Sequence, residues 1–191
     1  MECIYWSMLN KTKIMKNLIA VLVLTALFIG CGQDNDTLIV KNQLGKINKS
    51  TSIEELDKMF KNDSIEKLPK GEELTRQYSV FGTDGKQKLV FVTKLKNDSI
   101  KGLELVKIYS DGYLTEKGIS TASTFGVVSE NYTINKIEPS FSAAILFVDE
   151  INATISLNKS DLNLDEFDMR PIRQDQIPDE ASINYITLWF E

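Results

Sequence analysis

Few residues of this chain can carry out covalent or metal chemistry. Its 191 residues include no histidine and only two cysteines, Cys3 and Cys31. Without histidine, the chain lacks the commonest general base and the commonest ligand of transition metals. Pairs of serine or cysteine with histidine, and Cys/His zinc sites, are therefore excluded. The thiol of Cys31 and the 27 carboxylates are the candidates that remain.

Cys31 follows a segment with the features of a secretion signal. Lys16 supplies a positive charge, and an uncharged apolar run covers 18–29. A helix of that length spans ~18 Å, too short for the ~30 Å hydrocarbon core of a bilayer. We therefore predict a signal peptide at 1–30, with Met15 as the true start. The alternative is a buried hydrophobic helix that ends at a glycine, with the thiol packed in the core.

The end of this segment also resembles a bacterial lipobox. Residues 27–31 read Leu-Phe-Ile-Gly-Cys, with Phe28 in the slot that leucine usually fills. The resemblance implies acyl chains such as palmitate on Cys31, a lipidated tether at 31–37, and a place in the cell envelope. The acidic residues just after the cysteine resemble the surface-export signal of Bacteroidetes-type lipoproteins. We therefore expect an outer-membrane lipoprotein, with its surface and periplasmic faces both left open.

The carboxylates form no motif of an active site or a metal site. A calcium-loop pattern begins at Asp161, but its sixth and twelfth positions hold Glu166 and Ile172 instead of Gly and Glu. A solvated acidic turn is the favoured interpretation, and weak calcium binding is the alternative. Asp149 and Glu150 lie at a predicted hairpin tip, which is exposed to water, whereas catalysis by paired carboxylates needs one acid in an apolar pocket. A solvated turn is therefore the favoured interpretation. We expect no catalytic residue, no metal, no other cofactor and no enzymatic activity.

A short polar pattern, Asn-Asp followed by Ser or Thr and an apolar residue, occurs three times. Such sequences form Asx turns at the ends of helices and strands. They also resemble the O-glycosylation sequon of secreted Bacteroidetes-type proteins, which implies sugars on Thr37, Ser64 and Ser99. The two interpretations are compatible.

The charge of the chain restricts its partners. Three of the 22 basic and one of the 27 acidic residues precede Cys31, so residues 31–191 carry 19 basic and 26 acidic side chains, a net charge of −7. The phosphates of nucleic acids and of anionic lipids repel such a chain. We expect no nucleic-acid partner, and contact with the membrane through the lipid on Cys31.

The remainder, 38–191, has the pattern of a single α+β domain. Ser52 and Glu55 form a predicted capping box at the start of an amphipathic helix. Period-two runs joined by Gly- and Asn-containing turns predict an antiparallel sheet with helices packed on one face. Trp189 and Phe190 are neighbours in the last run; core packing is the favoured interpretation over a ligand platform, although alternation would leave one of them outward. Strands are predicted at 38–40, 77–81, 88–93, 103–109, 141–148, 153–157 and 183–190, and a short helix at 162–167.

The order of helix, hairpin and strand occurs twice. We therefore predict two degenerate repeats, 38–110 and 111–191. Three features of the first half recur in the second at a nearly constant distance along the chain: the glycine before the helix, the N-cap of the helix and the apolar face of the helix. Chance similarity is the alternative interpretation. The equivalent pairs are Gly45 and Gly118, Ser52 and Thr124, Leu56 and Val128, and Phe60 and Tyr132.

This arrangement resembles the tandem modules of β-lactamase-inhibitor proteins and of the small lipoprotein of the outer-membrane barrel-assembly machine. Those modules also place a Gly-x-[ST]-type turn before a capped helix and follow it with antiparallel strands. The resemblance covers residues 45–190 and, like that to the uncharacterised lipoproteins of Bacteroidetes-type bacteria, carries over no functional residue except Cys31. It implies a non-enzymatic envelope lipoprotein that binds or scaffolds a protein partner. The alternative is an inhibitor of a secreted or envelope hydrolase.

Overall fold

The computed structural model covers the predicted domain but not the predicted signal. It describes residues 35–68, 75–96, 99–162, 164–165 and 167–191. The expected signal peptide and Cys31 therefore lie outside the described residues. Residues 34–191 form one compact unit, and every residue of its core cluster lies between Ile39 and Phe190, so this unit contains all that its own core needs.

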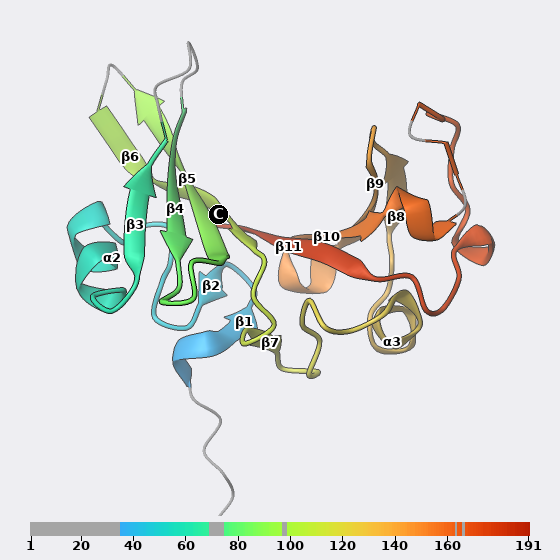
Figure 1. Ribbon diagram of the computed structural model, residues 1–191, viewed down its shortest axis with the longest axis horizontal. Helices are drawn as coiled ribbons and strands as arrows, with labels where there is room; N and C mark the ends of the chain where they lie inside the picture. The colour runs from blue at the N-terminus through green and yellow to red at the C-terminus, as the bar shows by residue number, and fades with distance from the viewer. Residues whose placement is uncertain (1–34, 69–74, 97–98, 163, 166) are drawn as a thin grey trace, which may run out of the picture. The chain divides into compact units, whose positions relative to one another are not determined.

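Antiparallel strands are the predominant regular elements of the described residues (Figure 1). Eight of them form one sheet in the order β3-β4-β5-β6-β11-β10-β9-β8. Two four-stranded meanders, drawn in green and in orange to red, therefore meet where β6 pairs with β11. The strands are β3 (Ser64–Lys67), β4 (Thr75–Phe81), β5 (Gln87–Lys96), β6 (Ser99–Ile108), β8 (Lys136–Pro139), β9 (Ala143–Val148), β10 (Ala153–Asn158) and β11 (Ile183–Trp189).

A second, three-stranded sheet joins the two halves of the chain. Its central strand β1 (Leu38–Val40) pairs antiparallel with β2 (Gln43–Leu44) and parallel with β7 (Leu114–Thr115). Four 3₁₀ turns complete the described elements: η1 (Asn35–Thr37), η2 (Asp149–Ile151), η3 (Lys159–Leu162) and η4 (Gln174–Gln176).

The first helix, α2 (Ile53–Met59), begins at the predicted capping box. The Glu55 N–H donates to the Ser52 hydroxyl at 3.2 Å, and the Ser52 N–H donates to the Glu55 carboxylate at 2.7 Å. Leu56 is buried, and the ring of Phe60 at the C-cap lies 6.0 Å from that of Phe91 on β5. Local hydrogen bonds therefore start this helix, and packing against the sheet fixes its position.

The second helix, α3 (Phe125–Asn131), begins differently. Thr124 is its N-cap residue, as predicted, but its side chain makes no capping hydrogen bond. Instead the Phe125 N–H donates to the Ala181 carbonyl at 2.9 Å, and the Gly126 N–H donates to the Asp179 carbonyl at 2.8 Å. The free N–H groups of this helix are thus satisfied by a distant segment of the chain.

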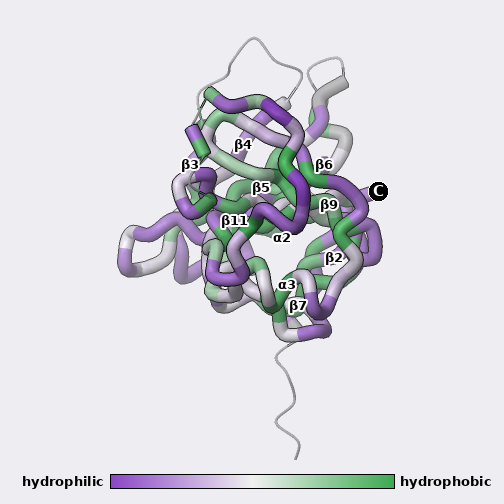
Figure 2. Tube along the Cα trace, turned by 90° about the vertical axis from the view of Figure 1, so that its right-hand side faces the viewer, coloured by the Kyte–Doolittle hydropathy of each residue, from purple (hydrophilic) through white to green (hydrophobic). Residues whose placement is uncertain are grey.

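One apolar cluster forms the core of the unit. Both helices and both four-stranded groups contribute to it, among them Leu56, Phe91, Val128 and Ile186. Hydrophobic residues, in green, predominate along β5 and β11, and hydrophilic residues, in purple, along many of the surrounding loops (Figure 2). Helices and strands therefore share a single core, as an α+β fold requires.

Three details of the sequence-based fold prediction differ from the structure. The described residues of 162–167 are not helical: Leu162 ends a 3₁₀ turn, and Leu164 and Asp165 are irregular. Four strands of two to four residues, β2, β3, β7 and β8, were not predicted. The two α-helices are also short, with about two turns each, and do not form a continuous layer over one face of the sheet.

Several hydrogen bonds recur at the same offset as the sequence pattern. The Asn48 N–H donates to the Thr51 hydroxyl at 3.0 Å, and the Ser120 N–H donates to the Ser123 hydroxyl at 3.1 Å. In both loops the fourth residue returns a backbone bond to the first, each at 3.1 Å. The first residue of β3 and the first residue of β8 are separated by the same offset, and so are their last residues.

Candidate protein-interaction surface

On the face of the sheet turned away from the core, an exposed tryptophan lies where β6 pairs with β11. Val106 and Leu188 belong to the core cluster, so the alternating residues Leu105 and Trp189 point to the opposite face. Leu105 is paired with Trp189 across the two strands. Trp189 is 39% exposed, whereas its neighbour Phe190 is buried, which agrees with the predicted alternation.

Two tyrosines and a lysine extend this surface. The rings of Tyr109 and Tyr185 lie 5.4 Å apart at 45°, and Lys107 Nζ lies 5.4 Å from the centre of the Tyr185 ring. Burial, and to a smaller extent Tyr185, raise the pKa of Tyr109, so its hydroxyl stays protonated at neutral pH. We call the set Leu105, Lys107, Tyr109, Tyr185 and Trp189 the seam surface.

Buried aliphatic side chains support the seam surface from the next strand. Val90 lies opposite Lys107, and Val92 lies opposite Leu105. Val90, Val92 and Leu105 are all buried, yet none belongs to the core cluster. This second apolar layer holds the lysine and the aromatic side chains of the seam surface in place.

Lys107 has an unusual electrostatic setting. Within the described residues, no carboxylate forms an ion pair with it, although the chain has an excess of acidic residues. It is half-buried and rests over an aromatic ring. The seam surface therefore offers one positive charge beside exposed aromatic area.

The edges of the sheet are less suitable for binding. β3 presents Glu66 and Lys67, and β8 ends with Pro139, which has no N–H to donate. Charged residues and proline are the usual protection of an edge strand against pairing with another chain. A partner is therefore better accommodated on the face of the sheet than along either edge.

The predicted glycosylation residues lie at the ends of elements. Thr37 ends η1, Ser64 begins β3 and is exposed, and Ser99 begins β6. This placement agrees with the turn interpretation at Thr37 and Ser64, whereas residues 97–98 of the third sequence lie outside the described residues. Glycosylation of Thr37, Ser64 and Ser99 stays a prediction.

Of the two carboxylates at the predicted hairpin tip, Glu150 is engaged in hydrogen bonds with other residues of the chain. Glu150 accepts hydrogen bonds from Lys117 Nζ at 2.7 Å and from the Thr133 N–H at 2.9 Å. The hydrogen bond from Lys117 is the main reason that the pKa of Glu150 lies below its usual range, so the carboxylate is ionised at neutral pH. Both Asp149 and Glu150 are exposed, in agreement with a solvated tip.

The acidic turn after β10 does not assemble a calcium site in the described residues. Asp161 accepts hydrogen bonds from the N–H and the hydroxyl of Ser182, and Asp168 pairs with Arg170 at 2.6 Å. The described part of the chain contains no group of three or more Asp, Glu, Cys or His side chains placed to hold a metal ion.

Sequence reasoning singled out Trp189 but missed Lys107, Tyr109 and Tyr185. A signal was present, because Leu105, Lys107 and Tyr109 alternate along the predicted strand 103–109. The pairing of β6 with β11 brings them beside Tyr185 and Trp189, and no local pattern specifies that pairing.

Comparisons with known proteins address the fold alone. No family model and no curated protein matches the chain. The solved structure of the uncharacterized protein yfeY from Escherichia coli is similar, with a TM-score of 0.53 and 9% sequence identity over 82% of this chain and 99% of that chain. At that identity the likeness supports the fold and says nothing of function. Within the described ranges, no helix has the length and hydropathy of a membrane span.

Proposed function

We propose that this protein is a non-enzymatic lipoprotein of the cell envelope that binds a partner protein on the seam surface. The exposed Trp189, on the same face as Lys107 and the tilted pair Tyr109 and Tyr185, is the observation that carries the proposal. Tryptophan and tyrosine are enriched among the residues that dominate binding energy at interfaces. A partner that sets an acidic side chain against Lys107 and an apolar one against the exposed Trp189 fits this surface.

The lipid on Cys31 would hold the protein at the membrane. Each buried CH₂ of an acyl chain contributes ~0.8 kcal/mol, so two or three chains attach a protein almost permanently. Cys31→Ser should therefore release the protein from the membrane fraction. The check is the incorporation of labelled fatty acid into the wild type, whose absence would overturn the anchor.

Pull-down from membranes tests the partner. The full chain and its Lys107→Glu and Trp189→Ala variants are compared with Val127→Ala, a control that removes an exposed apolar side chain elsewhere, on α3. We expect the two seam variants to lose most of a stoichiometric partner, roughly tenfold or more for a residue that dominates binding, and the control to retain it. Equal recovery by all variants would contradict the assignment of the seam surface.

The same pull-down distinguishes the two kinds of partner. A captured structural protein of the envelope supports a scaffolding role. A captured hydrolase whose activity falls on binding supports the alternative, an inhibitor. Protease treatment of intact cells then places the domain: cleavage indicates the cell surface, and protection until the outer membrane is permeabilised indicates the periplasmic face.

We also propose that residues 38–110 and 111–191 descend from one duplicated unit. The recurrent loop hydrogen bonds, the matching offset between β3 and β8, and the mirrored strand order support a common origin. The seam surface then lies where the two copies meet, so each copy supplies part of it.

A further inference from the structure

Two phenylalanines and a methionine project into solvent at one end of the sheet. Phe141 precedes β9, while Phe167 and Met169 lie in the segment between β10 and β11. They are 66%, 76% and 52% exposed. The two phenylalanine rings meet edge to face with their centres 6.2 Å apart. We call these three residues the aromatic tip.

A buried lysine holds the two halves of the aromatic tip together. Lys159 is only 1% exposed, and its Nζ donates to the Ser140 carbonyl at 2.9 Å and to the Asp168 carbonyl at 2.5 Å. Ser140 immediately precedes Phe141, and Asp168 immediately follows Phe167. Burial of a lysine is costly unless its donors are engaged, so this cation is committed to the position of both loops.

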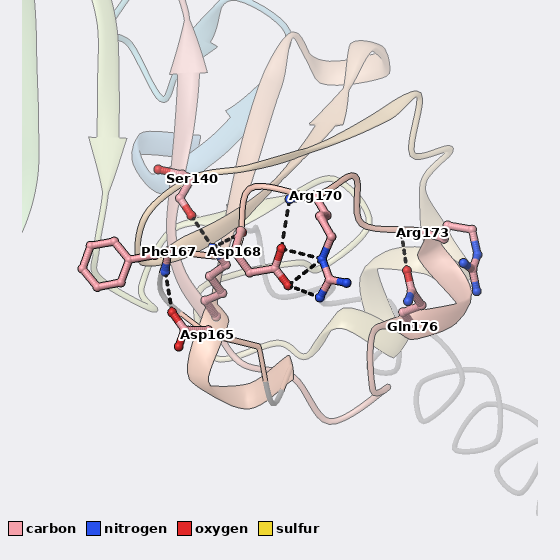
Figure 3. A network of polar contacts seen from close by, with 8 residues as sticks. Ser140, Asp165, Phe167, Asp168, Arg170, Arg173 and Gln176 are labelled. Atoms are coloured by element: carbon pink, nitrogen blue, oxygen red, sulfur yellow. Dashed lines mark hydrogen bonds and ion pairs between the residues drawn. The ribbon is translucent and has the colours of Figure 1, made fainter.

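Further hydrogen bonds fix the backbone at Phe167 (Figure 3). The Phe167 N–H donates to the Asp165 carboxylate at 2.8 Å, and the Asp168 N–H donates to the Asp165 carbonyl at 3.0 Å. Arg170 binds the Asp168 carboxylate through two nitrogens. The exposed phenylalanine is therefore presented by an ordered turn.

Ion pairs beside the aromatic tip cancel local charge. Asp168 is paired with Arg170, and Glu138 is paired with Lys136 on β8. Repulsion between an acidic chain and anionic headgroups is therefore weakened at this end of the sheet. The aromatic tip therefore combines apolar side chains with two neighbouring ion pairs.

We propose that the aromatic tip inserts into the lipid surface to which the protein is anchored. This proposal rests on the proposed envelope anchor. The three side chains expose roughly 400 Å², about half of the ~800 Å² that a specific protein interface needs from each partner. Insertion into a lipid interface has no such minimum, and it gains from an acyl anchor because two weak membrane signals reinforce each other. A rigid, convex and apolar tip with paired charges fits the boundary between headgroups and acyl chains.

The test uses the unit 34–191, which contains its whole core. A histidine tag at its N-terminus tethers it to neutral phosphatidylcholine vesicles that contain a chelator lipid. Trp189→Phe removes the one tryptophan of this unit, and Phe167→Trp then places a fluorophore in the aromatic tip. Val127→Trp in the same background is the matched control at an exposed apolar residue of α3.

We expect the Phe167→Trp fluorescence to shift to the blue and to be quenched by brominated acyl chains, and the Val127→Trp fluorescence to do neither. Adding Phe141→Ser should lower the inserted fraction by about tenfold. Adding Lys159→Met should lower it as well, although both aromatic residues of the tip remain. Equal behaviour of the two tryptophan positions, or no effect of Phe141→Ser, would overturn the proposal. Because the tag supplies the tether, the result does not depend on whether Cys31 carries lipid.

Discussion

The two halves of the chain start equivalent helices in different ways. In the first half, Ser52 and Glu55 satisfy the free N–H groups of α2 from within the helix's own first turn. In the second half, Thr124 has the right side chain but makes no such bond. Carbonyls of Asp179 and Ala181, which lie far beyond the helix in the sequence, replace it. Local hydrogen bonding and tertiary contact are thus interchangeable means of starting a helix.

The segment between β10 and β11 accounts for the difference. The first half has no counterpart to it, because the equivalent strands β5 and β6 are separated by residues 97–98 alone. In the second half, residues 159–182 return the chain past the N-terminus of α3. The segment that carries the aromatic tip therefore also supplies the N-terminal hydrogen bonds of the neighbouring helix α3.

The cores of the two halves should respond alike. Leu56 and Val128 are both buried, and they occupy equivalent positions of the two proposed repeats. We expect Leu56→Ala to lower the free energy of unfolding by ~2–4 kcal/mol and Val128→Ala by ~1–3 kcal/mol, as core deletions. Thermal and denaturant unfolding measure both. A silent variant of the pair would break the proposed equivalence of the halves.

The equivalent glycines should respond differently. Gly45 and Gly118 both have positive φ, +56° and +75°. A Cβ on Gly45 would lie 2.2 Å from the Asp36 carbonyl oxygen, whereas one on Gly118 meets nothing within 4 Å. We expect Gly118→Ala to cost ~1 kcal/mol for the left-handed backbone, and Gly45→Ala about 2–3 kcal/mol, because the clash with backbone adds to that strain. Equal losses in chemical denaturation would show that the first loop relaxes freely.

The N-caps give the smallest and sharpest contrast. Ser52→Ala removes a hydroxyl that accepts from the helix, so we expect a loss of ~1 kcal/mol. Thr124→Ala removes a hydroxyl with no capping bond, so the change should stay within ~0.5 kcal/mol. Both are read from the midpoint of urea unfolding. A loss at Thr124 as large as that at Ser52 would contradict the long-range cap.

Local patterns predicted the elements better than their partners. The capping box of α2 and the buried face of α3 follow from spacing alone, and the structure has both. Alternation predicted that one of Trp189 and Phe190 turns outward, and the structure shows that it is Trp189. The seam surface and the role of Lys159 could not be predicted in this way. Both depend on segments that are distant in the sequence, such as β6 beside β11 and Ser140 beside Asp168.

The position of β11 has a consequence for the order of folding. β3 to β6 form hairpins between neighbouring segments, and they can close as soon as residue 108 is free. β11, by contrast, occupies the middle of the sheet between β6 and β10. Until residues 183–189 arrive, those two strands each keep an open side with unpaired backbone groups. A chain that emerges from a translocation pore with its N-terminus first should therefore pass through a half-assembled state. The exposed strands of that state should attract chaperones. Pairing of β11 with β6 and β10 should then complete the sheet.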